Sequence, residues 1–295
     1  MIKAVVSVVG KDQKGVVAKF ATYMAERGIN IEDIHQQVVH GRFIMDMLVD
    51  LAELSVSLDE LITGLIALGK SIDMEVRVAL QSRRRKKLAI LVSKEAHCLI
   101  QLLEDHKLGK LACDIVGVYG NHPDLEPVAR QAGLSFACQP SAGGQKAAHM
   151  AWLQGELTRA EADLVVLARY MQVLPPEFVR AFADKIINIH PSLLPFFPGA
   201  NAYEQAWKSG VRVSGCTAHF VTENLDEGPV VLQDVFHIDV GKDNAEDVKK
   251  KGQTLEAQVL SQAVQMYLDE KLVVVDGKVV FRPGISRFLN GEERA

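Results

Sequence analysis

The hydrophobic and polar positions of the first eighty residues alternate between the periods of a strand and a helix. A β-branched apolar run is followed by apolar positions at helical spacing, and the alternation repeats. The pattern predicts a strand over 2–9, a helix over 16–28, strands over 29–39 and 42–50, a helix over 57–70 and a strand over 72–80. The order βαββαβ predicts an antiparallel sheet with both helices on one face.

The pattern changes near residue 87, where short and continuously apolar strands begin to alternate with helical segments. Such alternation is typical of a parallel sheet that helices cover on both faces. The predicted strands are 87–93, 113–120, 134–139, 162–170, 185–190, 211–221 and 228–238, and the predicted helices are 94–108, 124–132, 144–160 and 243–270. An Asp-Gly turn predicts a final hairpin over 272–281. The fold class is therefore α/β, with a βαββαβ ferredoxin-like domain ahead of a doubly wound, mostly parallel domain.

The basic segment QSRRRKK marks the boundary between the two patterns. We expect a small domain over 1–80, a solvated linker over 81–87 and a larger domain over 88–295. A run of basic residues can also be an RNA-binding patch or a targeting signal. The linker interpretation is favoured, because the segment separates two strand patterns in a mildly acidic chain.

Composition narrows the class of protein. The chain has 295 residues, 48% hydrophobic residues and a formal net charge of -4, which favours neither nucleic-acid nor membrane-surface binding. Its four cysteines are widely spaced and predict reduced thiols, and the first residues lack the pattern of a signal peptide. No apolar stretch approaches the length of a membrane span, so we expect a cytoplasmic protein.

The candidate chemistry gathers near the last strands of the second domain. No dinucleotide, P-loop, GxSxG or HExxH motif occurs, and the scattered histidines predict no metal site. Asn188 and His190 are two residues apart, so an extended backbone points both side chains to one side, and Pro191 favours that geometry. Ligands of doubly wound sheets bind at the carboxyl ends of strands, which is where this pair lies.

An amide and an imidazole that face one point are suited to acyl chemistry. Asn188 can donate a hydrogen bond to a developing oxyanion, His190 can transfer a proton, and a nearby carboxylate such as Asp226 can orient water. No Ser, Cys or Lys nucleophile is evident, which favours direct attack by water or an amine. The alternative is structural, because Asn often caps a turn and His beside Pro often shapes a bend. His219, in an apolar strand, is expected to be a hydrogen-bonded core histidine rather than a ligand.

Two segments closely resemble the folate-dependent formyltransferase family. They are NIHPSLLPFFPGANAYEQAWKSGV and GCTAHFVTENLDEGPVVLQDV, and the family motif is Asn-x-His-Pro-Ser-x-x-Pro together with the Asp of Leu-Asp-x-Gly-Pro. The resemblance implies catalytic roles for Asn188, His190 and Asp226. The spacing had already selected Asn188 and His190, and Asp226 belongs to the polar segment that follows the next predicted strand.

The N-terminal stretch GKDQKGVVAKFATYMAERGINIEDI looks like an ACT domain, a small regulatory module. An ACT domain ahead of a formyltransferase domain is the layout of the deformylase branch of this family. The loop SKEAHC also lacks the glycines with which ribonucleotide-using relatives hold a phosphate. The resemblance thus implies hydrolysis of 10-formyltetrahydrofolate to formate and tetrahydrofolate, which supplies formate for purine synthesis and balances one-carbon pools. It implies no metal and no other cofactor.

Two other functions stay open. Deformylases usually carry a second histidine after the catalytic one, and Pro191 stands there in this chain, as in the transferases. Transfer of the formyl group to an amine acceptor is therefore the first alternative. An inactive folate or amino-acid sensor is the second.

The resemblance also implies binding residues. The folate ring should contact the YMQVL segment and the VTENLD loop, with Met171, Val173, Leu174, Thr222 and Glu223 as substrate-binding residues. In the ACT domain, Gly15 and Asn30 should lie near a small-ligand site that forms where such domains pair, with glycine or methionine as the expected effector. A homo-oligomer is then expected. The alternative is that the domain only drives oligomerisation and that Gly15 only forms a turn.

Overall fold

The structure is a computed structural model that describes residues 3–80, 84–196 and 201–281. It divides into two compact units, one formed by the N-terminal residues up to Arg84 and the other beginning at Arg85. Residues 81–83 of the expected linker and 282–295 of the expected second domain lie outside the described residues. Lys86 and Lys87, the last two residues of the expected linker, are part of a strand.

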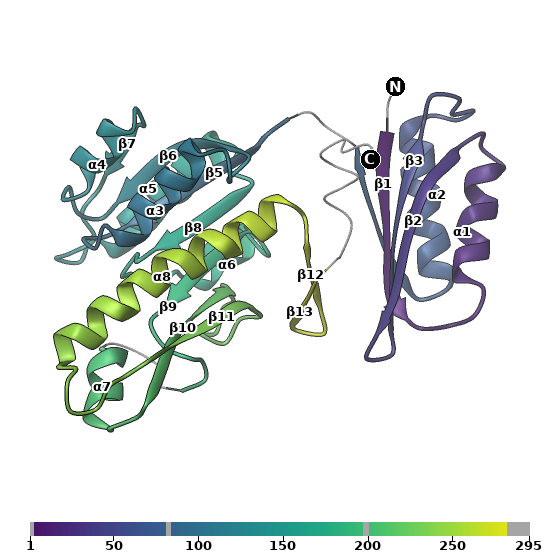
Figure 1. Cartoon of the computed structure of the whole chain (residues 1–295). Helices are drawn as coiled ribbons and strands as arrows, with labels where there is room; N and C mark the ends of the chain where they lie inside the picture. The colour runs from purple at the N-terminus through teal and green to yellow at the C-terminus, as the bar shows by residue number, and fades with distance from the viewer. Residues whose placement is uncertain (1–2, 81–83, 197–200, 282–295) are drawn as a thin grey trace. The chain divides into compact units, whose positions relative to one another are not determined.

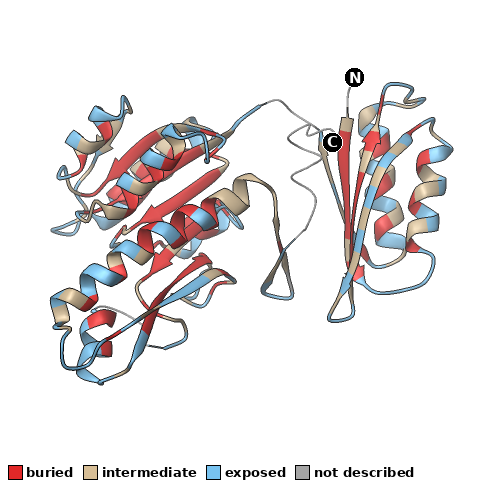
Figure 2. Cartoon of the chain, viewed as in Figure 1, coloured by how far each residue is buried: buried red, intermediate tan, exposed pale blue. Residues whose placement is uncertain are grey.

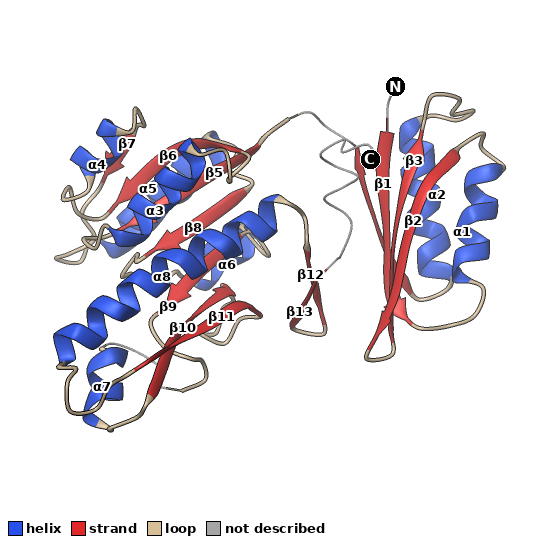
Figure 3. Cartoon of the chain, viewed as in Figure 1, coloured by secondary structure: helices blue, strands red, loops and turns tan. Residues whose placement is uncertain are grey.

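The first unit has the predicted βαββαβ order (Figure 3). Its elements are β1 (Lys3–Lys11), α1 (Val16–Ala25), β2 (Asn30–Val39), β3 (Arg42–Asp50), α2 (Leu58–Ser71) and β4 (Met74–Leu80). The four strands pair antiparallel in the order β2-β3-β1-β4. His40 and Gly41 both have positive φ, as the tight hairpin between β2 and β3 requires.

The core of this unit lies between the sheet and its two helices (Figure 2). Alternate residues of β1 such as Val6 and Val8 pack with Phe20 of α1 and Leu65 of α2. The Ser57 side chain caps α2 by accepting a hydrogen bond from the Glu60 backbone N–H. The prediction of both helices on one face of an antiparallel sheet is confirmed.

The second unit contains a seven-stranded sheet in the order β11-β10-β9-β8-β5-β6-β7. Its strands are β5 (Lys86–Val92), β6 (Cys113–Gly120), β7 (Phe136–Cys138), β8 (Leu164–Ala168), β9 (Ile186–His190), β10 (Val213–Phe220) and β11 (Val230–His237). Its helices are α3 (His97–Lys107), α4 (Glu126–Gln131), α5 (Lys146–Arg159), α6 (Pro176–Ala181), α7 (Ala202–Lys208) and α8 (Ala245–Leu268). A separate hairpin, β12 (Leu272–Val275) and β13 (Lys278–Phe281), follows α8.

Helices cover the seven-stranded sheet on both faces (Figure 1). One core lies under α3 and α8 and includes Ile187 and Ile189 of β9. The other lies under α5 and α6 and includes Ile186 of the same strand. Strands β5 to β9 are parallel to one another, and β10 pairs antiparallel with both β9 and β11, so the predicted doubly wound, mostly parallel domain is confirmed.

The sequence did not predict the short helices α6 and α7. Each has only one or two turns, too few to establish a helical hydrophobic period. The long helix α8 was predicted, and Asn244 begins it with a capping box in which its side chain and that of Asp247 each bond the other's backbone. No helix in the described part of the chain is long and apolar enough to cross a membrane.

Candidate active site

The predicted pair Asn188 and His190 lies at the carboxyl end of β9. Ile187 and Ile189 of this strand face the core under α3 and α8, so alternation points Asn188 and His190 to the other face of the sheet. The side chain of His190 is buried, with 6% of its surface exposed. The strand therefore presents an amide and an imidazole on one side, as their spacing predicted.

The antiparallel neighbour β10 brings a second imidazole to the same place. In the register of β9 and β10, His219 pairs with Asn188. The Asn188 Nδ2 atom lies 3.2 Å from His219 Nε2, and His219 Nδ1 lies 2.9 Å from the Phe220 carbonyl oxygen. Because a carbonyl only accepts, Nδ1 carries the proton and Nε2 accepts from the Asn188 amide.

Burial favours the neutral form of His219. It lowers the pKa of His219, and the hydrogen bond to Phe220 and the charge of Asp226 only partly offset that effect. A neutral imidazole with this tautomer fixes which end of the Asn188 amide faces β10. His219 is thus a hydrogen-bonded core histidine, as its apolar surroundings suggested, but its partner is the predicted site residue Asn188.

Asp226 completes the group from the loop between β10 and β11. Its Oδ2 atom lies 3.2 Å from His190 Nδ1, and its Oδ1 atom lies 3.8 Å from His219 Nε2. The loop returns closely on itself, because the Phe220 N–H donates to the Pro229 carbonyl and a Cβ on Gly228 would lie 1.7 Å from the Phe220 carbonyl oxygen. Only glycine fits there, which explains the Gly-Pro turn beside the carboxylate.

The second nitrogen of His190 is left for another partner. Among the described residues, His190 Nε2 is a buried side-chain atom with no hydrogen-bond partner. Buried polar groups are normally paired, so such an atom in a cavity needs an explanation. Asp226 occupies Nδ1, and Nε2 is therefore the atom with which this imidazole can contact a bound molecule.

These side chains line a cavity of about 240 Å³. All five residues expected to bind the substrate also line it: Met171, Val173, Leu174, Thr222 and Glu223. Met171 and Val173 are exposed apolar side chains on the segment after β8. An apolar rim around a few polar groups is the usual character of a small-molecule site. Among the cavity residues that the sequence missed is Arg169, which follows an apolar strand without a motif.

Gly15 and Asn30 do not come together within one chain. Gly15 precedes α1 with φ of 85°, beyond the end of β1. Asn30 pairs with Asp50, which also pairs with Lys3 at the start of β1. The two residues therefore lie at opposite ends of a strand of nine residues, or about 30 Å.

Comparison with known proteins assigns both units. A family model described as formyl transferase matches residues 86–264, and one described as ACT domain matches residues 3–79. The fold and the site thus define a formyl transferase domain preceded by an ACT domain.

Curated relatives sharpen this class. The formyltetrahydrofolate deformylase of Synechocystis is 38% identical over 91% of this chain and 94% of that protein. The formyltetrahydrofolate deformylase of Bacillus subtilis is 36% identical over 91% of this chain and 90% of that protein. The chain belongs to the formyltetrahydrofolate deformylase family.

Solved structures agree with the relatives. The crystal structure of a formyltetrahydrofolate deformylase from Pseudomonas syringae aligns with a TM-score of 0.84 at 32% identity and covers 95% of this chain and 94% of that chain. A glycinamide ribonucleotide transformylase from Symbiobacterium toebii aligns with a TM-score of 0.63 at 32% identity and covers 68% of this chain and 95% of that chain. The likeness to the deformylase therefore extends over both units.

Proposed function

We propose that this protein hydrolyses 10-formyltetrahydrofolate to formate and tetrahydrofolate, with Asn188, His190 and Asp226 as its catalytic residues. Membership of the deformylase family supports the reaction. The observation that carries the residue assignment is the convergence of these three side chains in one cavity, with the buried Nε2 of His190 unpartnered among the described residues.

Each residue has a distinct part in the proposed mechanism. The Asn188 amide, held by His219 Nε2, directs its other N–H towards the formyl oxygen and stabilises the oxyanion as it forms. Protonated His190 supplies the second donor through Nε2. Asp226 stabilises the charged imidazole through Nδ1 and orients the attacking water.

The atoms balance without a covalent enzyme intermediate. The water oxygen bonds to the formyl carbon and gives up a proton as the tetrahedral intermediate forms. The bond from the formyl carbon to N10 then breaks while N10 takes a proton from His190. Tetrahydrofolate and formic acid leave, and formic acid releases its acidic proton to solvent as formate. The proton that Asp226 accepted from the attacking water restores the imidazole. These steps use water and protein side chains, and we propose that the reaction needs no metal or other cofactor.

The folate ring system is proposed to lie on the apolar side of the cavity. Met171 and Val173 offer exposed apolar side chains, and Leu174 is buried in the core under α5 and α6. Thr222 and Glu223 flank them from the loop that also carries Asp226. Polar edges of the bound ring could then hydrogen-bond to this loop while its flat faces contact the apolar side chains.

The direct test is to incubate the purified protein with 10-formyltetrahydrofolate alone and measure formate. Release above the buffer blank that is lost in Asp226→Asn is the expected result. Retention of near-normal activity in Asp226→Asn or His190→Ala would refute the assigned mechanism. A wild-type protein that binds the folate but releases no formate would instead favour transfer to an acceptor.

The ACT domain is proposed to bind glycine or methionine between two chains of a cytoplasmic homo-oligomer. Gly15 and Asn30 lie at opposite ends of the sheet, so one small ligand that contacts both needs a second copy of the domain. Titration of each amino acid against wild type, Gly15→Val and Asn30→Ala, read by formate release and by sedimentation, tests this proposal. A response that both variants retain would contradict it.

A further inference from the structure

A second charged cluster lies beside the catalytic group, on the other side of the sheet. Arg169 follows β8 and lines the cavity, and its Nε atom donates to Glu95 Oε2 at 2.8 Å. The same Nε lies 3.3 Å from Glu256 Oε2 in the middle of α8. The Arg169 side chain is 14% exposed and that of Glu256 is fully buried. This cluster has no role in the mechanism above.

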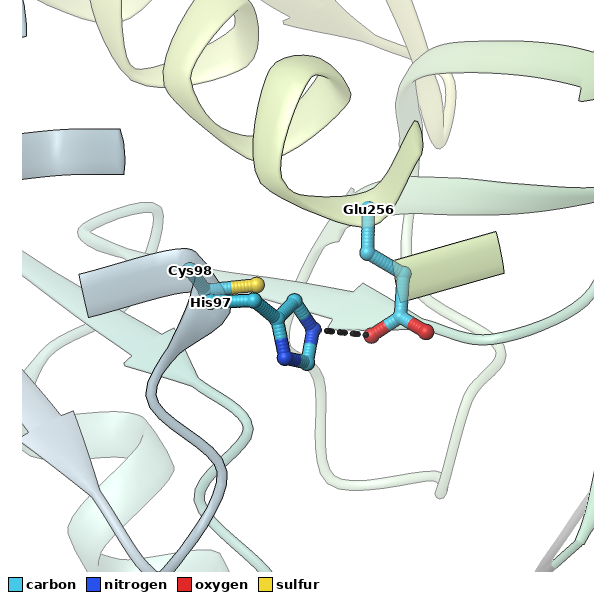
Figure 4. Close-up of side chains that lie close together, drawn as sticks. All are labelled: His97, Cys98 and Glu256. Carbon is cyan, nitrogen blue, oxygen red and sulfur yellow. Dashed lines mark hydrogen bonds and ion pairs between the residues drawn. The ribbon is translucent and has the colours of Figure 1, made fainter. Parts of the chain in front are cut away.

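The Glu256 carboxylate joins several elements at this point. His97 Nε2 at the start of α3 lies 3.2 Å from its Oε2, and the Tyr203 hydroxyl of α7 donates to its Oε1 at 2.7 Å. Figure 4 shows the His97 ring and the Glu256 carboxylate facing one another. Both oxygens are thus engaged, and the cluster forms a packed wall rather than an open site.

A metal ion is a poor fit for the same atoms. His97, Cys98 and Glu256 offer ligand atoms within 4.8 Å of one another (Figure 4). However, a cation bound to Glu256 Oε2 would approach the Arg169 guanidinium on that same oxygen. Burial also raises the pKa of the Cys98 thiol well above its usual range, which disfavours the thiolate that a metal requires.

The charges of the cluster compensate one another. Arg169 and Lys249 supply two cations, and Glu95 and Glu256 supply two carboxylates, with Lys249 Nζ 3.5 Å from Glu95 Oε1. Although burial acts in the opposite direction, these carboxylates raise the pKa of Arg169, so the guanidinium stays charged. An anion that entered would have to displace a carboxylate from Arg169, which is costly for a buried pair.

The Arg169 cluster lies on the opposite side of the sheet from Asn188 and His190. Asn188 and His190 point away from the core under α3 and α8, towards the side where the folate is proposed to lie. Arg169, with φ of 61°, turns its side chain to the opposite side, against α3 and α8. Asp226 orients the attacking water on the first side, but Arg169 also lines the cavity, so an acceptor whose substituents extend towards α3 and α8 would meet the Arg169 cluster.

We propose that the Glu95–Arg169–Glu256 cluster makes the site specific for water by excluding amine acceptors, above all those that carry an anionic group. The proposal rests on the proposed function, since it concerns the group that attacks the formyl carbon. Water needs no more space than one small cavity position, whereas an amine must bring its substituents past Arg169. Transformylases of the same fold are named for a ribonucleotide, which carries a phosphate, and such a group would have to displace a carboxylate from Arg169, the cluster residue that lines the cavity.

The test opens and neutralises the wall in one variant. Arg169→Gly suits the positive φ at this position, and Glu256→Gln avoids leaving a buried carboxylate unpaired. The double variant and wild type are given 10-formyltetrahydrofolate with glycinamide or with O-phosphoethanolamine. Formate and the N-formylated amine are both quantified, and the readout is their ratio rather than the total rate.

Wild type should yield formate and no N-formylated amine above the uncatalysed blank. The double variant should raise the ratio of formylated amine to formate by about tenfold or more. The matched control is Asp105→Asn with Lys110→Met, which removes a charge pair between α3 and its following turn, where Ser261 of α8 also bonds Asp105, away from the cavity. Its ratio should equal that of wild type.

Several outcomes would overturn the proposal. They are formyl transfer to either amine by wild type, an unchanged ratio in a folded double variant, and an equal change in the control. If the double variant does not fold, the proposal is tested by measuring whether O-phosphoethanolamine inhibits formate release by wild type. Competitive inhibition by millimolar amounts would show an anion site where the wall is proposed, and its absence supports the wall. Failure of wild type to release formate without any amine would instead refute the proposed function.

Discussion

Two charged groups at the carboxyl ends of neighbouring strands teach different lessons. The group of His190, Asn188, His219 and Asp226 leaves His190 Nε2 buried without a partner in the described chain. The cluster of Glu95, Arg169 and Glu256 pairs each of its charges. A site that binds a substrate has polar atoms, such as His190 Nε2, that are free to hydrogen-bond to it. A wall that excludes a substrate has its polar atoms already paired within the protein.

The largest expected effect is a loss of kcat when residues of the catalytic group are replaced. His190→Ala removes the proposed proton donor, and Asp226→Asn removes the charge that faces its Nδ1. Each should lower kcat by about a thousandfold, the usual scale for loss of an acid–base group combined with oxyanion stabilisation. Formate release under single-turnover conditions measures it. A loss below tenfold in either variant would remove that residue from the catalytic group.

The next effect separates His219 from the residues that act directly. His219→Ala removes the acceptor that orients the Asn188 amide. It should lower kcat by roughly ten- to a hundredfold with a smaller change in KM, because the Asn188 donor remains but is no longer fixed. His219→Gln, which can accept from Asn188 through its side-chain oxygen, should recover part of the loss. Equal kcat for the two variants would mean that the orientation of the amide does not matter.

Substitutions in the Glu95–Arg169–Glu256 cluster should lower the stability of the fold. Glu256→Ala leaves the buried Arg169 with one carboxylate and the Tyr203 hydroxyl without its acceptor. Breaking a buried pair in this way should lower the free energy of unfolding by about 3–5 kcal/mol. Glu256→Gln, which keeps the shape and one acceptor oxygen, should cost less. Denaturant unfolding of the two variants measures the difference, and identical stabilities would show that the charge has no part in the wall.

The free energy of unfolding should depend on pH through two buried histidines, one in the catalytic group and one outside it. Burial lowers the pKa of both His219 and His149 below the usual value near 6.5. The unfolded chain therefore binds more protons than the folded one below about pH 6.5, so stability should fall as pH falls through that window. Unfolding free energies at pH 7.5 and pH 5.5 measure the slope, and His219→Gln should reduce it. An unchanged slope in that variant would assign the effect elsewhere.

The smallest effect is expected for an exposed pair at the cavity rim. Arg180 Nη1 lies 2.9 Å from Glu223 Oε2, with side chains 61% and 48% exposed. Exposed pairs of this kind contribute about 1 kcal/mol or less. Arg180→Gln should therefore leave the unfolding temperature nearly unchanged, which a thermal melt checks. A large loss of stability would mean that exposure is a poor guide to the difference between this pair and the buried cluster.

Much of the fold follows from local pattern. The alternation of β1, α1, β2 and β3 and the continuously apolar strands β5 to β9 were predicted to within a few residues. The turns at His40–Gly41 and Asp276–Gly277 were also predicted, and each has the positive φ values that its residue types favour. The short helices α6 and α7 were missed, because one or two turns show no period and depend on packing against the sheet.

The sequence by itself determined the pair Asn188 and His190, because two residues of one strand at i and i+2 share a side whatever lies around them. Asp226 was selected by its motif, but only the β10–β11 loop brings its carboxylate to 3.2 Å from His190. Tertiary structure alone decided the partners of His219 and Arg169. Their contacts join residues 31 to 87 positions apart, through strand register and helix packing that no local pattern encodes.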